Sequence, residues 1–238
     1  MKRLSTIMAV LLCCLFSLAR SEDGGDAFER FYFMRGGYMA PQSFEVTLTE
    51  DGYTIRENDG NPWALDPSLA EDLLRIVADC GLKQWDGFHG TNPHVLDGEG
   101  FALEMAFSDG TTVYASGTNA FPDGYREASD RLDELFEKAK MSRIAGVYRC
   151  EGEGFGGDFV ITLNADGSYT FYEGYLSSYM GGGTWSVFYN TVYLTEENGL
   201  DLSFTFGVRE NALVYLATAS DPFPYVDLAD GTRFVRQE

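Results

Sequence analysis

The 238-residue chain has few basic residues, histidines or cysteines, and each shortage excludes a class of function. Its 17 Lys and Arg residues stand against 37 Asp and Glu residues, so the formal net charge is −20. A surface of this sign repels nucleic acid and anionic lipid, and we expect neither as a partner. Two histidines leave little material for a histidine-based active site, and four cysteines do not make a disulfide scaffold.

Long hydrophobic runs are also scarce. One run covers residues 7–18, and no later run is long enough to cross a membrane. It follows Lys2 and Arg3 and ends in small residues, which is the pattern of a secretory signal peptide. A bilayer span takes about 20 apolar residues, so this run is short for an anchor. We therefore predict that residues 1–21 are a signal peptide and that the protein is secreted or held in the cell envelope.

The four cysteines leave two questions open. Cys13 and Cys14 raise a lipoprotein alternative, but a bacterial lipobox has a small residue before the lipidated cysteine, and apolar residues surround both. Cleavage would leave only Cys80 and Cys150. Export permits a disulfide between them. The two fall in a predicted helix end and a predicted strand of different domains, so two separate buried thiols fit at least as well.

Asp-Gly pairs recur in both halves of the chain and predict the turns of antiparallel hairpins. Three such pairs, which begin at Asp51, Asp109 and Asp166, lie between segments in which apolar residues alternate. Alternation with a period of two turns one side of each strand toward a core. The first two hairpins belong to the first half of the chain and the third to the second half.

Two helices are predicted, both in the first half. Asp66 suits the N-cap of the first helix, Pro67 its first helical position and Gly81 the position after its end. An apolar stripe with helical spacing predicts the second helix over residues 124–140. We therefore expect residues 22–141 to form an α+β domain of antiparallel hairpins, with both helices packed on one face of the sheet.

The second half has no helical periodicity. Residues 142–238 instead predict about eight short strands, and hence a small all-β antiparallel barrel. The expected strands cover residues 146–150, 158–164, 168–173, 183–188, 191–195, 200–207, 212–217 and 232–236.

Several motifs of this second half resemble those of a known protein family. Gly146-Val-Tyr148, Gly183-Thr-Trp185 and Val192-Tyr-Leu-Thr195 lie at the starts and middles of expected strands. Together they resemble the small lipocalin-like, calycin-type domains of secreted bacterial proteins. The resemblance implies a β-barrel and supplies no ligand.

An aromatic cluster in the second half is the candidate binding site. Tyr169 and Trp185 fall on the predicted inward side of their strands, whereas Tyr175 and Tyr179 are expected in a loop that also holds glycines 181–183. Rings on a loop at a barrel mouth can stack on sugars or close over an apolar ligand. The same rings can instead fill the core of a barrel that holds nothing.

No catalytic, metal-binding or cofactor motif assembles from the other residues. His89 and His94 lie in an expected loop, where Asp86 and Asp97 are near enough in sequence to complete a metal site. Two exposed histidines on a loop account for the pattern without a metal. The chain also lacks a Gly-x-Ser-x-Gly nucleophile motif. We therefore predict neither metal nor cofactor, and the sequence favours a non-catalytic role while leaving enzyme activity open.

These observations favour an exported, non-catalytic binding protein with a small-molecule or carbohydrate ligand at the mouth of the C-terminal barrel. One alternative is a protein-interaction module, either an inhibitor or a cell-envelope accessory factor, whose acidic surface meets a basic protein partner. Another is a hydrolase whose carboxylate pair goes unrecognised, because the spacing of such a pair is spatial rather than sequential.

Overall fold

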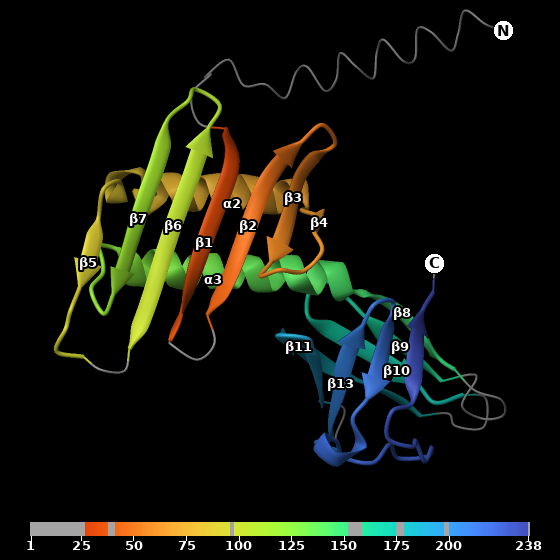
Figure 1. Cartoon of the computed structure of the whole chain (residues 1–238). Helices are drawn as coiled ribbons and strands as arrows, with labels where there is room; N and C mark the ends of the chain where they lie inside the picture. Colours follow the sequence, from red (N-terminus) through yellow and green to blue (C-terminus); the bar gives the residue numbers. More distant parts are fainter. Residues whose placement is uncertain are drawn as a thin grey trace, which may run out of the picture. The chain divides into compact units, whose positions relative to one another are not determined.

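The computed structural model describes residues 27–37, 41–95, 98–151, 159–174, 179–197 and 200–237. The predicted signal peptide, with Cys13 and Cys14, lies outside these described residues. The chain divides after Leu132 into two compact units, which are described separately below (Figure 1). Within the described ranges, no helix is both long enough and apolar enough to cross a membrane.

The first unit is built on a seven-stranded sheet in the order β4-β3-β2-β1-β6-β7-β5 (Figure 1). Neighbouring strands are antiparallel except β5, which runs parallel to β7. The two edge strands are the shortest. The strands are β1 (Phe28–Gly37), β2 (Gln42–Thr49), β3 (Gly52–Glu57), β4 (Trp63–Ala64), β5 (His89–Thr91), β6 (Glu99–Phe107) and β7 (Thr112–Thr118).

Both hairpins predicted for this unit are confirmed. The β2–β3 hairpin pairs Thr49 with Gly52, and the β6–β7 hairpin pairs Ala106 with Thr112. Gly110 has a φ of 87°, a left-handed conformation that glycine adopts without steric cost. Each turn therefore uses its Asp-Gly pair for the reason that made the pair predictive.

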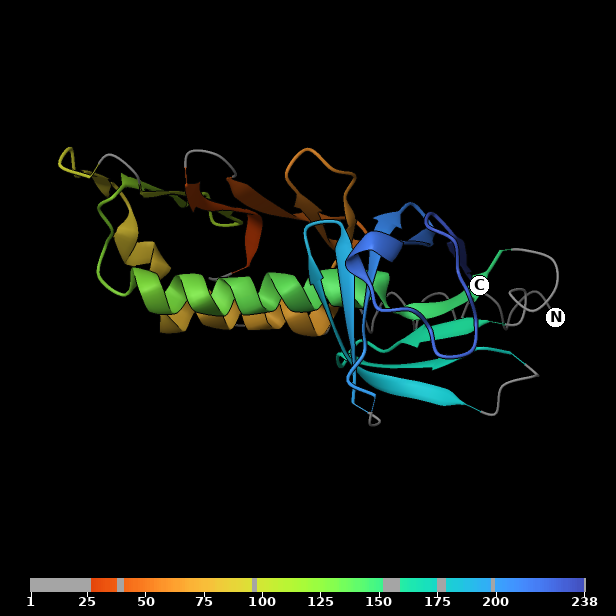
Figure 2. The same cartoon turned by 90° about the horizontal axis from the view of Figure 1, so that it is seen from below.

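Two helices, α2 (Pro67–Asp79) and α3 (Tyr125–Ile144), are described, and both were predicted. The side chain of Asp66 caps α2 by accepting the Ser68 backbone N–H at 2.8 Å, and Gly81 has a φ of 64° just beyond the helix. A short 3-10 turn, η1 (Leu82–Trp85), follows. The second helix continues to Ile144, past its predicted end at residue 140. Figure 2 shows α2 and the first part of α3 on the same face of the sheet.

Alternation sorts the side chains of the sheet into two faces. Residues such as Phe31 and Leu103 are fully buried on the face that the helices cover. Arg35 also turns to this side, where its guanidinium donates a hydrogen bond to the Ser129 hydroxyl of α3. On the opposite face Arg30 forms an ion pair with Glu104 at 2.8 Å. One face therefore carries the core, and the other is polar.

The segment that contains His89 corrects one prediction. Residues 89–91 form β5 and pair with Ser116–Thr118 of β7, where the sequence predicted a loop. A three-residue edge strand is too short to show a period of two, so its neighbour rather than its own pattern determines its conformation. His94, beyond the strand, is exposed.

The second unit is a closed antiparallel barrel in the order β10-β11-β12-β13-β14-β15-β8-β9. All the expected strands are present, within a few residues at each end, so the predicted α+β and all-β fold classes are both confirmed. The strands are β8 (Gly146–Cys150), β9 (Val160–Leu163), β10 (Ser168–Tyr172), β11 (Met180–Phe188), β12 (Thr191–Glu196), β13 (Ser203–Arg209), β14 (Ala212–Tyr215) and β15 (Arg233–Arg236).

The start of β11 corrects a second prediction. Glycines 181–183 were expected in a loop, but they pair with Tyr169, Thr170 and Phe171 of β10. The Phe171 ring occupies the space that a side chain at Gly181 would need, because a Cβ built there would lie 2.0 Å from Phe171 Cε1. These glycines therefore serve close packing rather than a turn.

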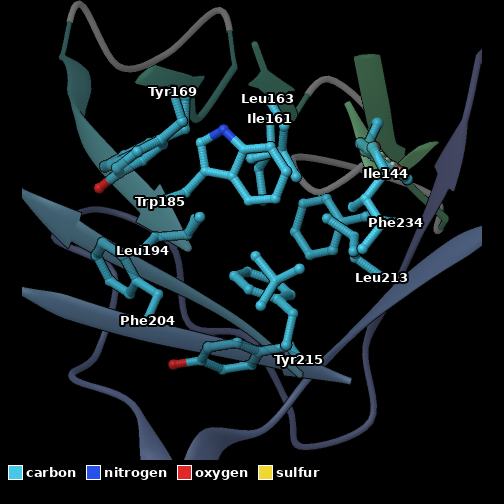
Figure 3. Packing of buried hydrophobic residues seen from close by; sticks show 14 of the residues in the cluster. Ile144, Ile161, Leu163, Tyr169, Trp185, Leu194, Phe204, Leu213, Tyr215 and Phe234 are labelled. Carbon is cyan, nitrogen blue, oxygen red and sulfur yellow. Dashed lines mark hydrogen bonds between the residues drawn. The ribbon is translucent and has the colours of Figure 1, made fainter. Parts of the chain in front are cut away.

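Aromatic and aliphatic side chains fill the interior of the barrel (Figure 3). Trp185 lies among them, and its indole N–H donates to the Asn164 carbonyl at 2.8 Å. Such rings bury large apolar areas, so this packing is the main source of the barrel's stability. Cys150 is buried in the same interior and Cys80 is half-buried in the first unit, and both are free thiols.

Candidate functional site

The two ends of the barrel differ in their connections. Tight turns at residues 164–167, 189–190 and 210–211 join strands at one end. At the other end, which we call the long-loop end, longer segments follow β8, β10, β12 and β14. These four strands run in the same direction because neighbours in the barrel are antiparallel. Side chains from the ends of separate strands therefore gather at the long-loop end.

Glu173 is the first of these side chains. It follows Tyr169 and Phe171 at intervals of two, so it continues the inward face of β10 beyond the strand's last residue. Only 2% of its surface is exposed, and neither carboxylate oxygen has a hydrogen-bond partner among the described residues. Burial raises the pKa of Glu173 from its ordinary 4.5 to about 7. The Tyr225 backbone N–H is close enough to oppose part of this rise, but it does not make a hydrogen bond of normal geometry to either oxygen.

Glu196 is the second. It ends the inward series Val192, Leu194 and Glu196 on β12 and is only 1% exposed. Its Oε1 accepts a hydrogen bond from the hydroxyl of Tyr179. Its Oε2 is buried and has no partner in the part of the chain that the structure describes.

Tyr169 brings a third unpaired group next to Glu196. It pairs with Gly183 across β10 and β11, and Gly183 pairs with Glu196 across β11 and β12. Gly183 has no side chain to place between the Tyr169 ring and Glu196, and the charge of Glu196 acts on the Tyr169 hydroxyl. The Tyr169 hydroxyl points away from the middle of the core cluster (Figure 3) and is buried without a described partner. Desolvation, followed by the charge of Glu196, raises its pKa.

Tyr179 donates a hydrogen bond to Glu196 and also responds to the charge of Glu173. Desolvation, the hydrogen bond to Glu196 and the charges of both Glu196 and Glu173 together raise the pKa of Tyr179 to about 12. The phenol therefore stays protonated at neutral pH and remains a donor to Glu196. Both carboxylates thus act on the same tyrosine.

A series of rings connects this polar group to the surface. Phe171 lies 5.8 Å from Tyr179, and Tyr179 lies 5.5 Å from Tyr225, measured between ring centroids. Deeper in the barrel, Phe204 stacks on Phe223 at 3.9 Å. Tyr225 is 67% exposed, so the series begins in solvent and ends in the core.

The four predicted site residues therefore do not all lie at the same place in the barrel. Tyr169 and Tyr179 both lie next to Glu196. Trp185 lies toward the tight-turn end, where it bonds to Asn164. Tyr175 lies outside the described residues. Sequence reasoning missed Glu173 and Glu196, although each extends an inward alternation of apolar residues by one step, and that pattern was the signal that could have found them.

The described part of the first unit also has hollows. One of about 220 Å³ lies beside α2 and η1, and a groove of about 300 Å³ lies on the polar face of the sheet. Its floor includes Gly100 and Ala102, and at its side His89 Nδ1 lies 2.9 Å from Ser116 Oγ. His89 and Ser116 therefore already pair with each other. In the described ranges, no three His, Cys, Asp or Glu side chains gather closely enough to hold a metal ion.

No protein-family model matches the chain, and no curated protein matches it. The site at the long-loop end must therefore be interpreted from its own geometry and charge.

Proposed function

We propose that this chain is an exported, non-catalytic binding protein whose barrel holds a polar group of a small ligand at the long-loop end. The observation that carries the proposal is the set of buried, unpaired polar atoms on Tyr169, Glu173 and Glu196. Each unsatisfied buried group costs about 1–3 kcal/mol, and native proteins rarely keep several together. A ligand that supplies the missing partners would recover this free energy on binding.

The remaining parts of the proposal rest on separate support. The closed antiparallel barrel supports the lipocalin-like assignment of the second half. The charged, apolar and small-residue pattern of residues 1–21 supports export, to the medium or to the cell envelope. Packing fills the interior of the barrel, so we assign the ligand to the end and not to a central lumen.

Mass spectrometry of the protein as exported by its own host tests this function directly. We expect the native mass to exceed the denatured mass by a discrete increment, and we expect the Glu196→Gln variant to lose that increment. Ordered water would also satisfy buried polar atoms. An increment of zero in the native protein, together with ordered waters on Glu173 and Glu196 in a crystal structure, would replace a ligand site with a hydrated one.

A hydrolase is the second candidate, because two carboxylates at one end of a barrel are what glycoside hydrolysis requires. A pKa near 7 would suit Glu173 to the role of general acid. The two carboxylates are at least 98% buried, so a scissile bond, like a bound ligand, reaches them only when the end opens. The hydrolase must in addition admit a water beside the scissile bond. Release of nitrophenol from a panel of nitrophenyl glycosides that Glu173→Gln abolishes would favour the hydrolase.

A further inference from the structure

The unpaired atoms at the long-loop end are mostly hydrogen-bond acceptors. They are both carboxylate oxygens of Glu173, Oε2 of Glu196 and the hydroxyl of Tyr169. A carboxylate accepts only, whereas a tyrosine hydroxyl can accept and donate. An occupant that satisfies these atoms must therefore bring several N–H or O–H donors.

The charge of the site limits which kinds of molecule can occupy it. Glu173 and Glu196 are both buried at this end of the barrel, and no described Lys or Arg side chain bonds to their unpaired oxygens. Burying an ionised carboxylate without a countercharge costs several kcal/mol. An anionic occupant would add repulsion, and a neutral occupant would leave the charge uncompensated. A cation removes the penalty, and the chain's net charge of −20 attracts it from solution.

The aromatic rings near the site also favour a cation. Phe171 and Tyr225 lie within 6 Å of the Tyr179 ring, measured between centroids. The faces of aromatic rings attract cations, and the attraction is strongest where water is excluded. The rings and the carboxylates therefore select the same sign of charge.

We propose that the long-loop end binds an organic cation with N–H donors, of the primary ammonium or guanidinium type, using Glu173 and Glu196 as countercharges and Tyr169 as a further acceptor. This inference rests on the proposed binding function and adds the class of ligand. A free amine and the side chain of a peptide lysine present the same chemistry, so the experiment includes both.

The test is an NMR titration of the full chain with side-chain carboxyl ¹³C labels on glutamate, at pH 8 and low salt. The probes are n-butylammonium, Nα-acetyl-lysine methylamide, tetramethylammonium, n-butanol and calcium chloride. We expect the two N–H cations to shift the Glu173 and Glu196 signals saturably and to bind at least about tenfold more tightly than n-butanol, the equivalent of one charged hydrogen bond. Tetramethylammonium carries the charge without donors, so it should bind more weakly than n-butylammonium.

Two binding-site variants and one matched control complete the test. Glu196→Gln should weaken n-butylammonium binding by about tenfold or more, and Tyr169→Phe by a smaller factor. Glu210→Gln, an exposed carboxyl in the β13–β14 turn of the same barrel, should leave binding unchanged. Circular dichroism of each variant verifies that the barrel remains folded.

The outcomes separate this inference from the proposed function. If n-butanol shifts the two glutamate signals as strongly as n-butylammonium, the site binds ligands but the cation assignment is wrong. If calcium ions saturate the site and the amines do not, a metal replaces the organic cation. If no probe moves either signal and the exported protein carries no bound mass, both the inference and the proposed function fail.

Discussion

Replacing Glu173 with Gln should stabilise the barrel at neutral and alkaline pH. Below pH 4.5 the carboxyl is protonated in both the folded and the unfolded chain, and it affects stability little. Between pH 4.5 and about 7 the unfolded chain releases this proton while the native protein keeps it, so stability falls as the pH rises. At about 1.4 kcal/mol per pH unit, the free energy of unfolding falls by at most about 3 kcal/mol over this interval.

The assay is urea unfolding of the parent and of Glu173→Gln at several pH values between 4.5 and 8. The difference in free energy of unfolding should be near zero at pH 4.5 and reach about 3 kcal/mol in favour of the variant at pH 8. Glu210→Gln is the control, and an exposed substitution of this kind should stay within about 0.5 kcal/mol throughout. A difference that does not grow with pH would mean that ionised Glu173 has a compensating partner, and the reasoning would be refuted.

Three further substitutions test the packing and the caps. Gly181→Ala should cost about 2 kcal/mol, because the new methyl group would displace the Phe171 ring; unchanged thermal stability would contradict that contact. Trp185→Phe should cost about 2 kcal/mol in urea unfolding through the lost bond to Asn164 and the space left behind, and a cost below about 0.5 kcal/mol would count against its buried position. Asp66→Ala should cost about 1 kcal/mol by removing the N-cap of α2, whereas a stabilised variant would mean the cap is not formed in solution.

Local signals in the sequence predicted most of the barrel. The strands on either side of Asp166-Gly167, β9 and β10, combine alternating apolar residues with a turn signal. Such signals depend on residues near one another in the chain, so they can be read without knowing the strand partners. The caps of α2 were predicted for the same reason, since Asp66 accepts a backbone N–H two residues away and Gly81 acts through its own positive φ.

Long-range pairing explains what sequence reasoning missed. The central strand β1 has no Asp-Gly turn beside it, and its position between β2 and β6 depends on partners up to 79 residues away, as the pairing of Phe28 with Phe107 illustrates. The site was missed for a related reason. Glu173 and Glu196 occupy inward positions that a search for apolar residues passes over, and only the closed barrel brings them to the same end.

The short edge strands of the seven-stranded sheet bear on how the protein behaves when concentrated. A sheet that is not closed exposes unpaired backbone groups along both borders, and these groups can recruit a strand from another molecule. Here the borders are β4, with two residues, and β5, with three. Each border therefore offers an incoming strand only a few backbone groups for hydrogen bonding. Self-association through this sheet should be slow even at high concentration.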